Sequence, residues 1–266
     1  MSHLLRELAP ISARAWELIE DEAKKTLTTY LAARKLVDFH GPHGWPHSAV
    51  NVGRARPVET LAEGVSTRVR EVQPLVELRV PFVLQRDELE RIDRGAEDAD
   101  ISQVNEAAKV IATAEDRAVF QGYPAGGIVG LGAASRSAQI KLGDDFLDYP
   151  PRVAAAVHKL RSEGIGGPYA IAVGPRCYRG LHETFTPSGY PVYRQVETLL
   201  DGPVVWAPAV DGAIVLSQRG GDFELTVGQD LSIGYLQHDA HSVHLYLEET
   251  LTFRVLAPEA AVPLVY

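Results

Sequence analysis

The 266-residue chain has a single cysteine, Cys177, and no long hydrophobic run. One cysteine excludes an internal disulfide and a zinc site made of thiolates, and it is typical of a reducing compartment. The apolar stretches, such as residues 204–210, fall far short of the roughly 20 residues that span a bilayer. No membrane partner is therefore expected.

A secretion signal is also missing from the first ten residues. A signal needs about 7 to 15 apolar residues, and here Glu7 and Pro10 interrupt the segment. The sequence thus predicts a cytoplasmic protein.

Basic residues are the minority charge. The 26 Lys and Arg residues face 35 Asp and Glu, which gives a formal net charge of −9 and a pI near 5.5. This balance is unlike that of a nucleic-acid binder, so no nucleic-acid partner is predicted. With 45% hydrophobic residues the chain has enough apolar side chains for a large core, which excludes a disordered protein.

Few side chains have the spacing of a catalytic or metal site. Two histidine groups are close in sequence: His40, His43 and His47, and His238, His241 and His244. The first group has only Asp38 as a nearby carboxylate, and the second leads into a predicted strand, whose alternate residues face opposite ways. Surface histidines are the favoured interpretation, and no metal is predicted.

Nucleotide and hydrolase motifs are absent as well. The glycine-rich loop 126–132 lacks the Lys-Ser or Lys-Thr of a phosphate-binding loop, and no Gly-x-Ser-x-Gly elbow occurs. Cys177 is favoured as a packed small residue over a nucleophile. The pair Asp144 and Asp145 is most simply a solvated loop or helix start.

Three helices are predicted from apolar residues at three- and four-residue steps. They cover residues 10–31, residues 102–121 with Ser102 as the N-cap and Gly122 after the end, and residues 151–163. The apolar stripe of the first helix needs a cover, either the body of the protein or a second chain.

The strands predict an α+β class with one interleaved fold. Residues 50–72 alternate like a two-stranded arm that is too polar to be stable alone. Further strands are predicted at 75–84, where the alternation is clean up to Val80, and at 169–173, 204–206, 213–216, 223–227, 231–235, 243–247 and 250–255.

Several ordered sequence blocks resemble the encapsulins, shell-forming proteins once described as linocin-type bacteriocins. They include Leu8-Ala-Pro-Ile11, Ala33-Arg-Lys-Leu-Val-Asp38, Pro74-Leu-Val-Glu-Leu-Arg-Val-Pro-Phe82, Glu115-Asp116, Arg219-Gly-Gly-Asp-Phe223, Gly228-Gln-Asp-Leu-Ser-Ile-Gly-Tyr235 and Glu249-Thr-Leu-Thr-Phe253. The blocks run across nearly the whole chain.

The resemblance implies a tailed-phage capsid fold of the Hong Kong 97 type. Residues 1–49 would then form a lumenal helix and the start of a peripheral domain, and residues 50–72 an extended loop that reaches neighbouring subunits. Residues 73–130 would form the peripheral domain with its spine helix, residues 131–205 the axial domain, and residues 206–266 the return to the peripheral domain.

The resemblance also implies a lumenal pocket for the C-terminal targeting peptide of a cargo enzyme. The positions that match the family's motifs are Leu27, Leu31, Arg34, Asp38, Asp230, Leu231 and Ile233. Apolar residues would supply burial, and the charged groups would orient an extended peptide. Leu27 and Leu31 as plain core residues, and Asp230 as a turn residue, remain alternatives.

The loop 182–191 resembles the one that lines the five-fold opening in this family. Its predicted pore-lining residues are His182, Glu183, Thr184, Thr186, Ser188, Gly189 and Tyr190. A small, hydrophilic lining would pass ions or small substrates, although a plain surface loop is the alternative. Some relatives bind flavin on an aromatic residue where this chain has Asp87, so no flavin and no other cofactor are predicted.

The function implied is a non-enzymatic protomer of an icosahedral homo-oligomeric shell. Its cargo would be a dye-decolourising peroxidase or a ferritin-like iron oxidase, which connects the shell with oxidative stress or iron storage. The alternatives are a secreted bacteriocin or peptidase and a phage major capsid protein.

Overall fold

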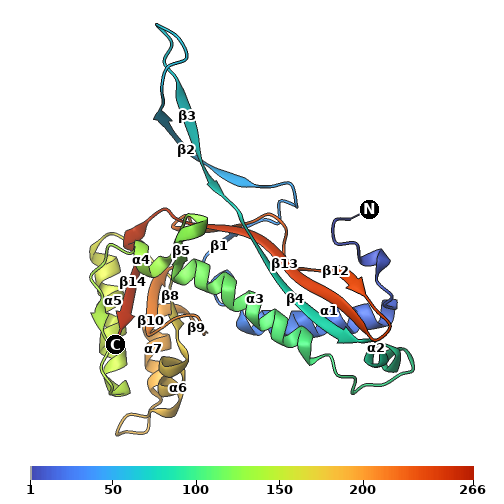
Figure 1. Ribbon diagram of the computed structural model, residues 1–266. Helices are drawn as coiled ribbons and strands as arrows, with labels where there is room; N and C mark the ends of the chain where they lie inside the picture. Colours follow the sequence, from blue (N-terminus) through green and yellow to red (C-terminus); the bar gives the residue numbers. More distant parts are fainter. Residues whose placement is uncertain (1) are drawn as a thin grey trace.

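The computed structural model describes residues 2–266 and shows two sheet-based units with an arm that projects from their junction (Figure 1). The helices are α1 (Ala13–Tyr30), α2 (Arg86–Asp93), α3 (Ser102–Phe120), α4 (Leu131–Ala134), α5 (Tyr149–Ser162), α6 (Pro175–Glu183) and α7 (Val192–Leu200). Five short 3-10 turns, η1 (Arg6–Leu8), η2 (Ala33–Lys35), η3 (Pro124–Gly126), η4 (Phe146–Asp148) and η5 (Pro258–Ala260), join them. The α+β class is confirmed.

The first sheet is built on one long strand. It contains β4 (Val76–Gln85), β1 (Asp38–His40), β11 (Phe223–Val227), β12 (Ser232–His238) and β13 (Ser242–Val255). Strand β13 pairs with β4 from Ser242 opposite Gln85 to Leu251 opposite Val76.

The prediction of two separate strands, 243–247 and 250–255, is therefore wrong. Glu248 and Glu249 look like a break in the sequence, yet both are fully buried inside β13. Each has an arginine partner: Arg79 Nη2 lies 2.7 Å from Glu248 Oε2, and Arg34 contacts Glu249. Burial of a charge is tolerated when it is paired in this way.

Helix α3 runs along this sheet, and α1 packs against α3 (Figure 1). Thr26 on α1 donates a hydrogen bond to Asn105 on α3 at 2.9 Å. Helix α1 starts three residues later than predicted, because Ser12 caps it by accepting the Ala15 N–H at 3.1 Å. Ser102 is not the cap of α3; Asp100 accepts the Ser102 N–H at 3.0 Å instead.

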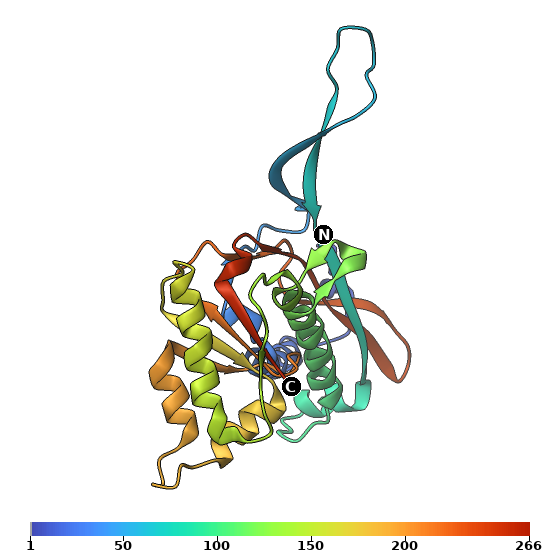
Figure 2. The same ribbon diagram turned by 90° about the vertical axis from the view of Figure 1, so that its left-hand side faces the viewer.

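The second sheet has the order β7-β14-β10-β8-β9. Its strands are β7 (Ile140–Lys141), β8 (Tyr169–Val173), β9 (Asp201–Trp206), β10 (Ala213–Ser217) and β14 (Ala261–Val265). Helices α5, α6 and α7 lie beside it, as Figure 2 shows. Because β10 and β14 come from the last part of the chain, the predicted boundary at residue 205 does not separate the two sheets. Helices α6 and α7 and strand β14 were not predicted.

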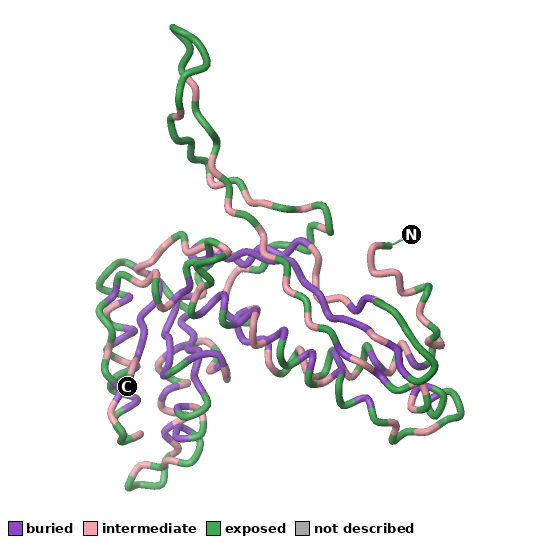
Figure 3. Tube along the Cα trace, in the orientation of Figure 1, coloured by how far each residue is buried: buried purple, intermediate pink, exposed green. Residues whose placement is uncertain are grey.

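The arm consists of β2 (Ala49–Pro57) and β3 (Arg68–Pro74), which pair only with each other. None of its residues is buried, and it projects away from both sheets (Figures 1 and 3). The predicted two-stranded arm is confirmed. A small hairpin, β5 (Gly122–Tyr123) and β6 (Ile128–Val129), lies near its base at the end of α3.

Candidate functional site

Arg34 is the centre of a group of carboxylates at the end of α1. It lies in η2, directly after the helix, and contacts three acidic residues from distant parts of the chain. Its Nε and Nη2 donate to Glu115 of α3 at 2.8–3.0 Å, and Nη1 donates to Asp230 Oδ1 at 2.8 Å. Nη2 also contacts Glu249 of β13. One guanidinium therefore joins the segment after α1 to α3, to the residues before β12 and to β13.

The carboxylates of this Arg34 cluster differ in how deeply they are buried. Glu115 and Glu249 are fully buried, whereas Asp230 is 39% exposed. Burial raises the pKa of Glu249 well above its usual value, and the neighbouring Glu115 raises it further. Burial opposes the charge on Arg34, but the carboxylates outweigh it and raise the pKa of Arg34.

Asp116 makes a second connection between α3 and the end of α1. The carboxylate is fully buried and accepts the backbone N–H groups of Ala32 and Ala33 at 2.9–3.2 Å. Burial raises the pKa of Asp116 to about 7, although these two hydrogen bonds act in the opposite direction. The segment after α1 is thus held on α3 from two sides.

The structure brings most of the predicted peptide-docking residues together. Arg34 contacts Asp230, while Leu27 and Leu231 are half-buried against the same apolar cluster that contains Ile233. Leu31 is only 8% exposed.

Asp38 lies elsewhere. It begins β1, and its Oδ2 accepts the Gly221 N–H at 2.6 Å in the turn before β11. Among residues 2–266 Asp38 forms no hydrogen bond or ion pair with the Arg34 cluster, although the ring of the adjacent Phe39 lies 5.0 Å from the Arg34 guanidinium.

The predicted set did not include Glu115, Asp116 and Glu249. The signal for all three was visible as a charge at a position where the surrounding pattern is apolar, on α3 and on β13. The N-terminal segment was missed too: His3 lies 2.5 Å from Glu248 and stacks on Trp45 with ring centroids 4.0 Å apart. Leu4 accepts the Tyr235 N–H at 2.8 Å, so this segment pairs with β12.

The predicted pore loop connects α6 and α7 and projects from the tip of the second unit (Figure 1). Thr186 closes the loop, because its N–H donates to the Tyr190 carbonyl at 2.9 Å and its Oγ1 accepts the Tyr190 N–H at 3.0 Å. The His182 ring lies beside the rings of Tyr178 and Tyr193, at 4.5 and 4.3 Å. Phe185 and Tyr190 are about half exposed, so the loop is more aromatic than its small polar residues indicate.

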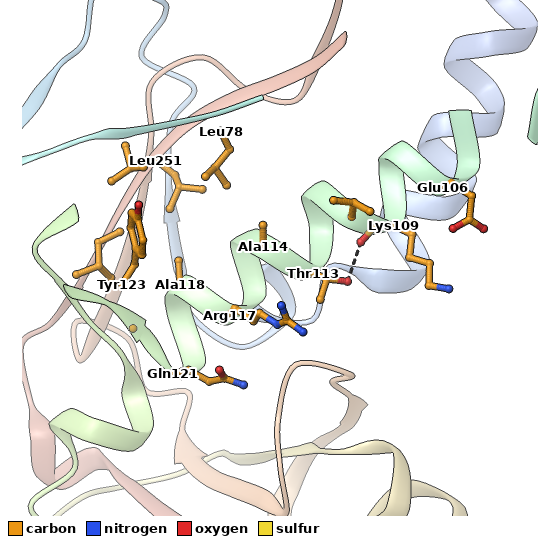
Figure 4. Close-up of a pocket in the computed structure, with 14 residues that line it drawn as sticks. Leu78, Glu106, Lys109, Thr113, Ala114, Arg117, Ala118, Gln121, Tyr123 and Leu251 are labelled. Atoms are coloured by element: carbon orange, nitrogen blue, oxygen red, sulfur yellow. Dashed lines mark hydrogen bonds between the residues drawn. The ribbon is translucent and has the colours of Figure 1, made fainter. Parts of the chain in front are cut away.

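A groove of about 640 Å³ lies on α3 between β4 and the β5–β6 hairpin (Figure 4). Leu78, Leu251 and Ala118 line its apolar part, and Lys109 and Arg117 lie at its polar side. The Thr113 hydroxyl donates to the Lys109 carbonyl of its own helix at 2.7 Å. No nucleophile with an adjacent base is present among the lining residues.

The other candidate residues form no reactive site. Within residues 2–266 no group of three or more His, Cys, Asp or Glu side chains could hold a metal ion. Cys177 is fully buried beside Tyr266 Oη at 3.1 Å, and burial raises the pKa of its thiol. Its interpretation as a packed residue is confirmed. His238 and His241 flank the β12–β13 turn, and Asp87 is exposed on α2.

Among residues 2–266, every helix is too short or too polar to cross a bilayer.

The family model described as "Encapsulating protein for peroxidase" matches residues 1–252. A type 1 encapsulin shell protein of Rhodospirillum rubrum is 57% identical over 99% of this chain and 96% of that protein. Its counterpart in Rhodococcus erythropolis is 47% identical over 99% of this chain and all of that protein.

Solved structures agree on the fold. A virus-like particle protein from Pyrococcus furiosus has a TM-score of 0.64 at 16% identity, covering 93% of this chain and 98% of that one. Mycobacterium phage Bobi gives a TM-score of 0.56 at 14% identity, covering 89% and 90%. The arm, the long α3 and the two sheets are thus those of the Hong Kong 97-type capsid fold, and the chain belongs to the encapsulin family of shell proteins.

Proposed function

We propose that copies of this chain assemble into a closed icosahedral shell in the cytosol and enclose a cargo enzyme. The arm is the observation that carries this proposal. It has no buried residue and no partner strand outside itself, and an isolated two-stranded hairpin is marginal in water. Its partner in an assembly is another copy. The encapsulin relatives support the same conclusion.

Assembly is tested by size-exclusion chromatography and negative-stain microscopy of the purified full-length chain. The proposal expects closed particles of uniform size at micromolar protomer concentration. A folded monomer or dimer under mild buffer conditions would refute it.

The cargo site is proposed on the surface formed by α1 and the start of β12. Leu27, Leu31, Leu231 and Ile233 supply the apolar part, and Arg34 with Asp230 supplies the charged edge. Asp38 is included only because it matches the family motif. In the structure its carboxylate accepts the Gly221 N–H. The description of the matching family model favours a peroxidase as cargo over a ferritin-like protein. A haem absorption band in purified native shells would distinguish the two.

Leu31→Asp is expected to leave shells assembled but nearly empty, because a charge on this surface opposes the docking of an apolar peptide. Leu27→Asp is the second variant, since Leu27 is less buried than Leu31 and its change is less disruptive to folding. Leu18→Asp on the same helix is the matched control outside the proposed set. Cargo is measured by mass spectrometry of particles purified after co-expression with a dye-decolourising peroxidase that carries a C-terminal targeting peptide. Native cargo levels in both test variants would rule out this surface.

The α6–α7 loop is proposed to line an opening at the five-fold axis. The polar side chains are His182 and Glu183 in the last turn of α6 and Thr184, Thr186 and Ser188 in the loop, with Gly189 and Tyr190 at its turn. On this proposal the second sheet and helices α5–α7 form the axial domain, and the first sheet with α3 forms the peripheral domain. The shell has no catalytic role of its own; chemistry belongs to the enclosed enzyme.

A further inference from the structure

The stem of the arm carries an excess of positive charge in an acidic protein. Strands β2 and β3 contain four arginines, Arg54, Arg56, Arg68 and Arg70, against one acid, Glu71. Within residues 2–266 these four arginines form no salt bridge and no side-chain hydrogen bond, and all are exposed. The chain itself therefore offers this charge no partner.

Three of these arginines border a groove of about 810 Å³ at the base of the arm, here called the arm groove. Arg54, Arg56 and Arg70 come from the stem, and Arg136 comes from the segment after α4. Its apolar part includes the buried Phe253 and four residues that are 44–56% exposed, Val69, Val72, Val129 and Leu256. An exposed apolar floor with a basic border is suited to an acidic polypeptide segment.

The opposite charge is concentrated on α2 and the loop that follows it. Residues 87–100, here called the acidic elbow, contain seven acidic and two basic residues, a formal charge of −5. Glu88 and Glu90 pair with Arg91 and Arg94 on the same helix.

Other carboxylates of the acidic elbow have no such partner. Asp87, Glu97 and Asp98 are exposed and make no ion pair or hydrogen bond to any part of residues 2–266. Small residues, Gly95, Ala96 and Ala99, flank the last two of these acids, so no bulky side chain stands next to them in the sequence.

The arm groove and the acidic elbow lie at opposite ends of α3 (Figure 1). The arm projects from the junction of the two units, whereas α2 lies at the far end of α3 (Figures 1 and 2). The two surfaces cannot meet within one protomer. A contact between different patches of identical chains is heterologous, and it forms closed rings when the rotation between neighbours closes.

We propose that the arm groove of each protomer binds the acidic elbow of a neighbouring copy, with the stem arginines facing Asp87, Glu97 and Asp98. This inference rests on the proposed shell function and adds the surface on which the arm docks. The charges fix the partner and the register of the contact, because like charges placed opposite each other repel and oppose any other docking.

Charge reversal tests the pairing in the full-length chain. Arg54→Glu with Arg70→Glu reverses the arm groove, and Glu97→Arg with Asp98→Arg reverses the acidic elbow; a fourfold variant combines both. Glu17→Arg with Asp21→Arg, two exposed acids on α1 without an ion pair in residues 2–266, is the matched control. The assembled fraction is measured by size-exclusion chromatography at one protomer concentration and low salt, with circular dichroism to establish folding.

Each reversal is expected to lower the ratio of assembled to free protomer at least about tenfold. The variant with all four substitutions is expected to restore this ratio. The control is expected to assemble like the native chain. Normal assembly of either reversed variant, or a fourfold variant that remains unassembled, would overturn the inference. So would an arm reversal whose only effect is the loss of bound nucleic acid. Failure of the native chain itself to assemble would instead refute the proposed shell.

Discussion

Replacing Asp116 with asparagine is expected to remove a pH dependence from the stability of this fold. The buried carboxyl has a pKa of about 7 in the folded protein, against an ordinary value of 3.8. Between about pH 4 and 7 the folded state therefore binds more protons than the unfolded state, and the free energy of unfolding falls as the pH rises. A difference of about 3 pKa units, at 1.36 kcal/mol each, corresponds to about 4 kcal/mol lost across this range.

Asparagine keeps the geometry but does not titrate. Its side-chain oxygen can replace Asp116 Oδ1, which accepts both Ala32 and Ala33 N–H groups at 3.2 and 2.9 Å. The variant should therefore become more stable relative to the native chain as the pH rises from 4 to 7, with a constant difference above about pH 8. Guanidinium unfolding at a fixed protomer concentration measures this difference, because the stability of an oligomer depends on concentration.

Asp239→Asn is the control of opposite sign. Hydrogen bonds from the His241 and Ser242 N–H groups lower the pKa of Asp239 to about 2. Its contribution is complete above about pH 4 and is lost as the pH falls toward 2, so Asp239→Asn should show no slope between pH 4 and 7. A stability difference between Asp116→Asn and the native chain that stays constant from pH 4 to 8 would refute the reasoning.

Two further changes test the interior. Glu249→Gln is expected to raise the guanidinium concentration at the unfolding midpoint, and the gain should grow as the pH rises. Glutamine replaces a buried carboxyl whose raised pKa makes ionisation costly. An unchanged midpoint would contradict this. Gly212→Ala should lower the midpoint more than Gly64→Ala. Both glycines have φ near +80°, but only a Cβ at position 212 would lie 2.2 Å from the Leu264 carbonyl oxygen, whereas position 64 is open; equal losses would show that φ alone decides.

The sequence predicts the elements whose pattern is local. The arm, α1, α3, α5 and strands β8 and β11 follow from periodicity within one segment, and their bounds agree to within a few residues. Strand β13 was divided in two because Glu248 and Glu249 break its apolar pattern. Their partners, Arg79 and Arg34, are at least 169 residues away in the chain, and no local pattern contains that pairing.

The residues of the proposed peptide site were predictable only in part, because their partners are also far away in the sequence. Sequence motifs indicated Arg34 and Asp230. In the structure Arg34 Nη1 lies 2.8 Å from Asp230 Oδ1, although 196 positions separate the two residues. The same motifs gave no role to Glu115, whose carboxylate binds Arg34 most extensively. An arginine that already contacts three carboxylates is a structural centre first. In the peptide site that we propose, its part would be to hold Asp230 in place at the exposed edge.

Net charge conceals the feature that assembly depends on in our proposal. The total of −9 excludes a broadly basic surface, yet the stem of the arm carries four unpaired arginines and the acidic elbow carries a formal −5. A protein that folds alone gains little from separating its charges to opposite ends, since each group stays solvated and screened over about 10 Å. Separation becomes useful when each end meets the other end of an identical chain, so the distribution of charge, and not its sum, is what distinguishes a shell subunit from a solitary acidic protein.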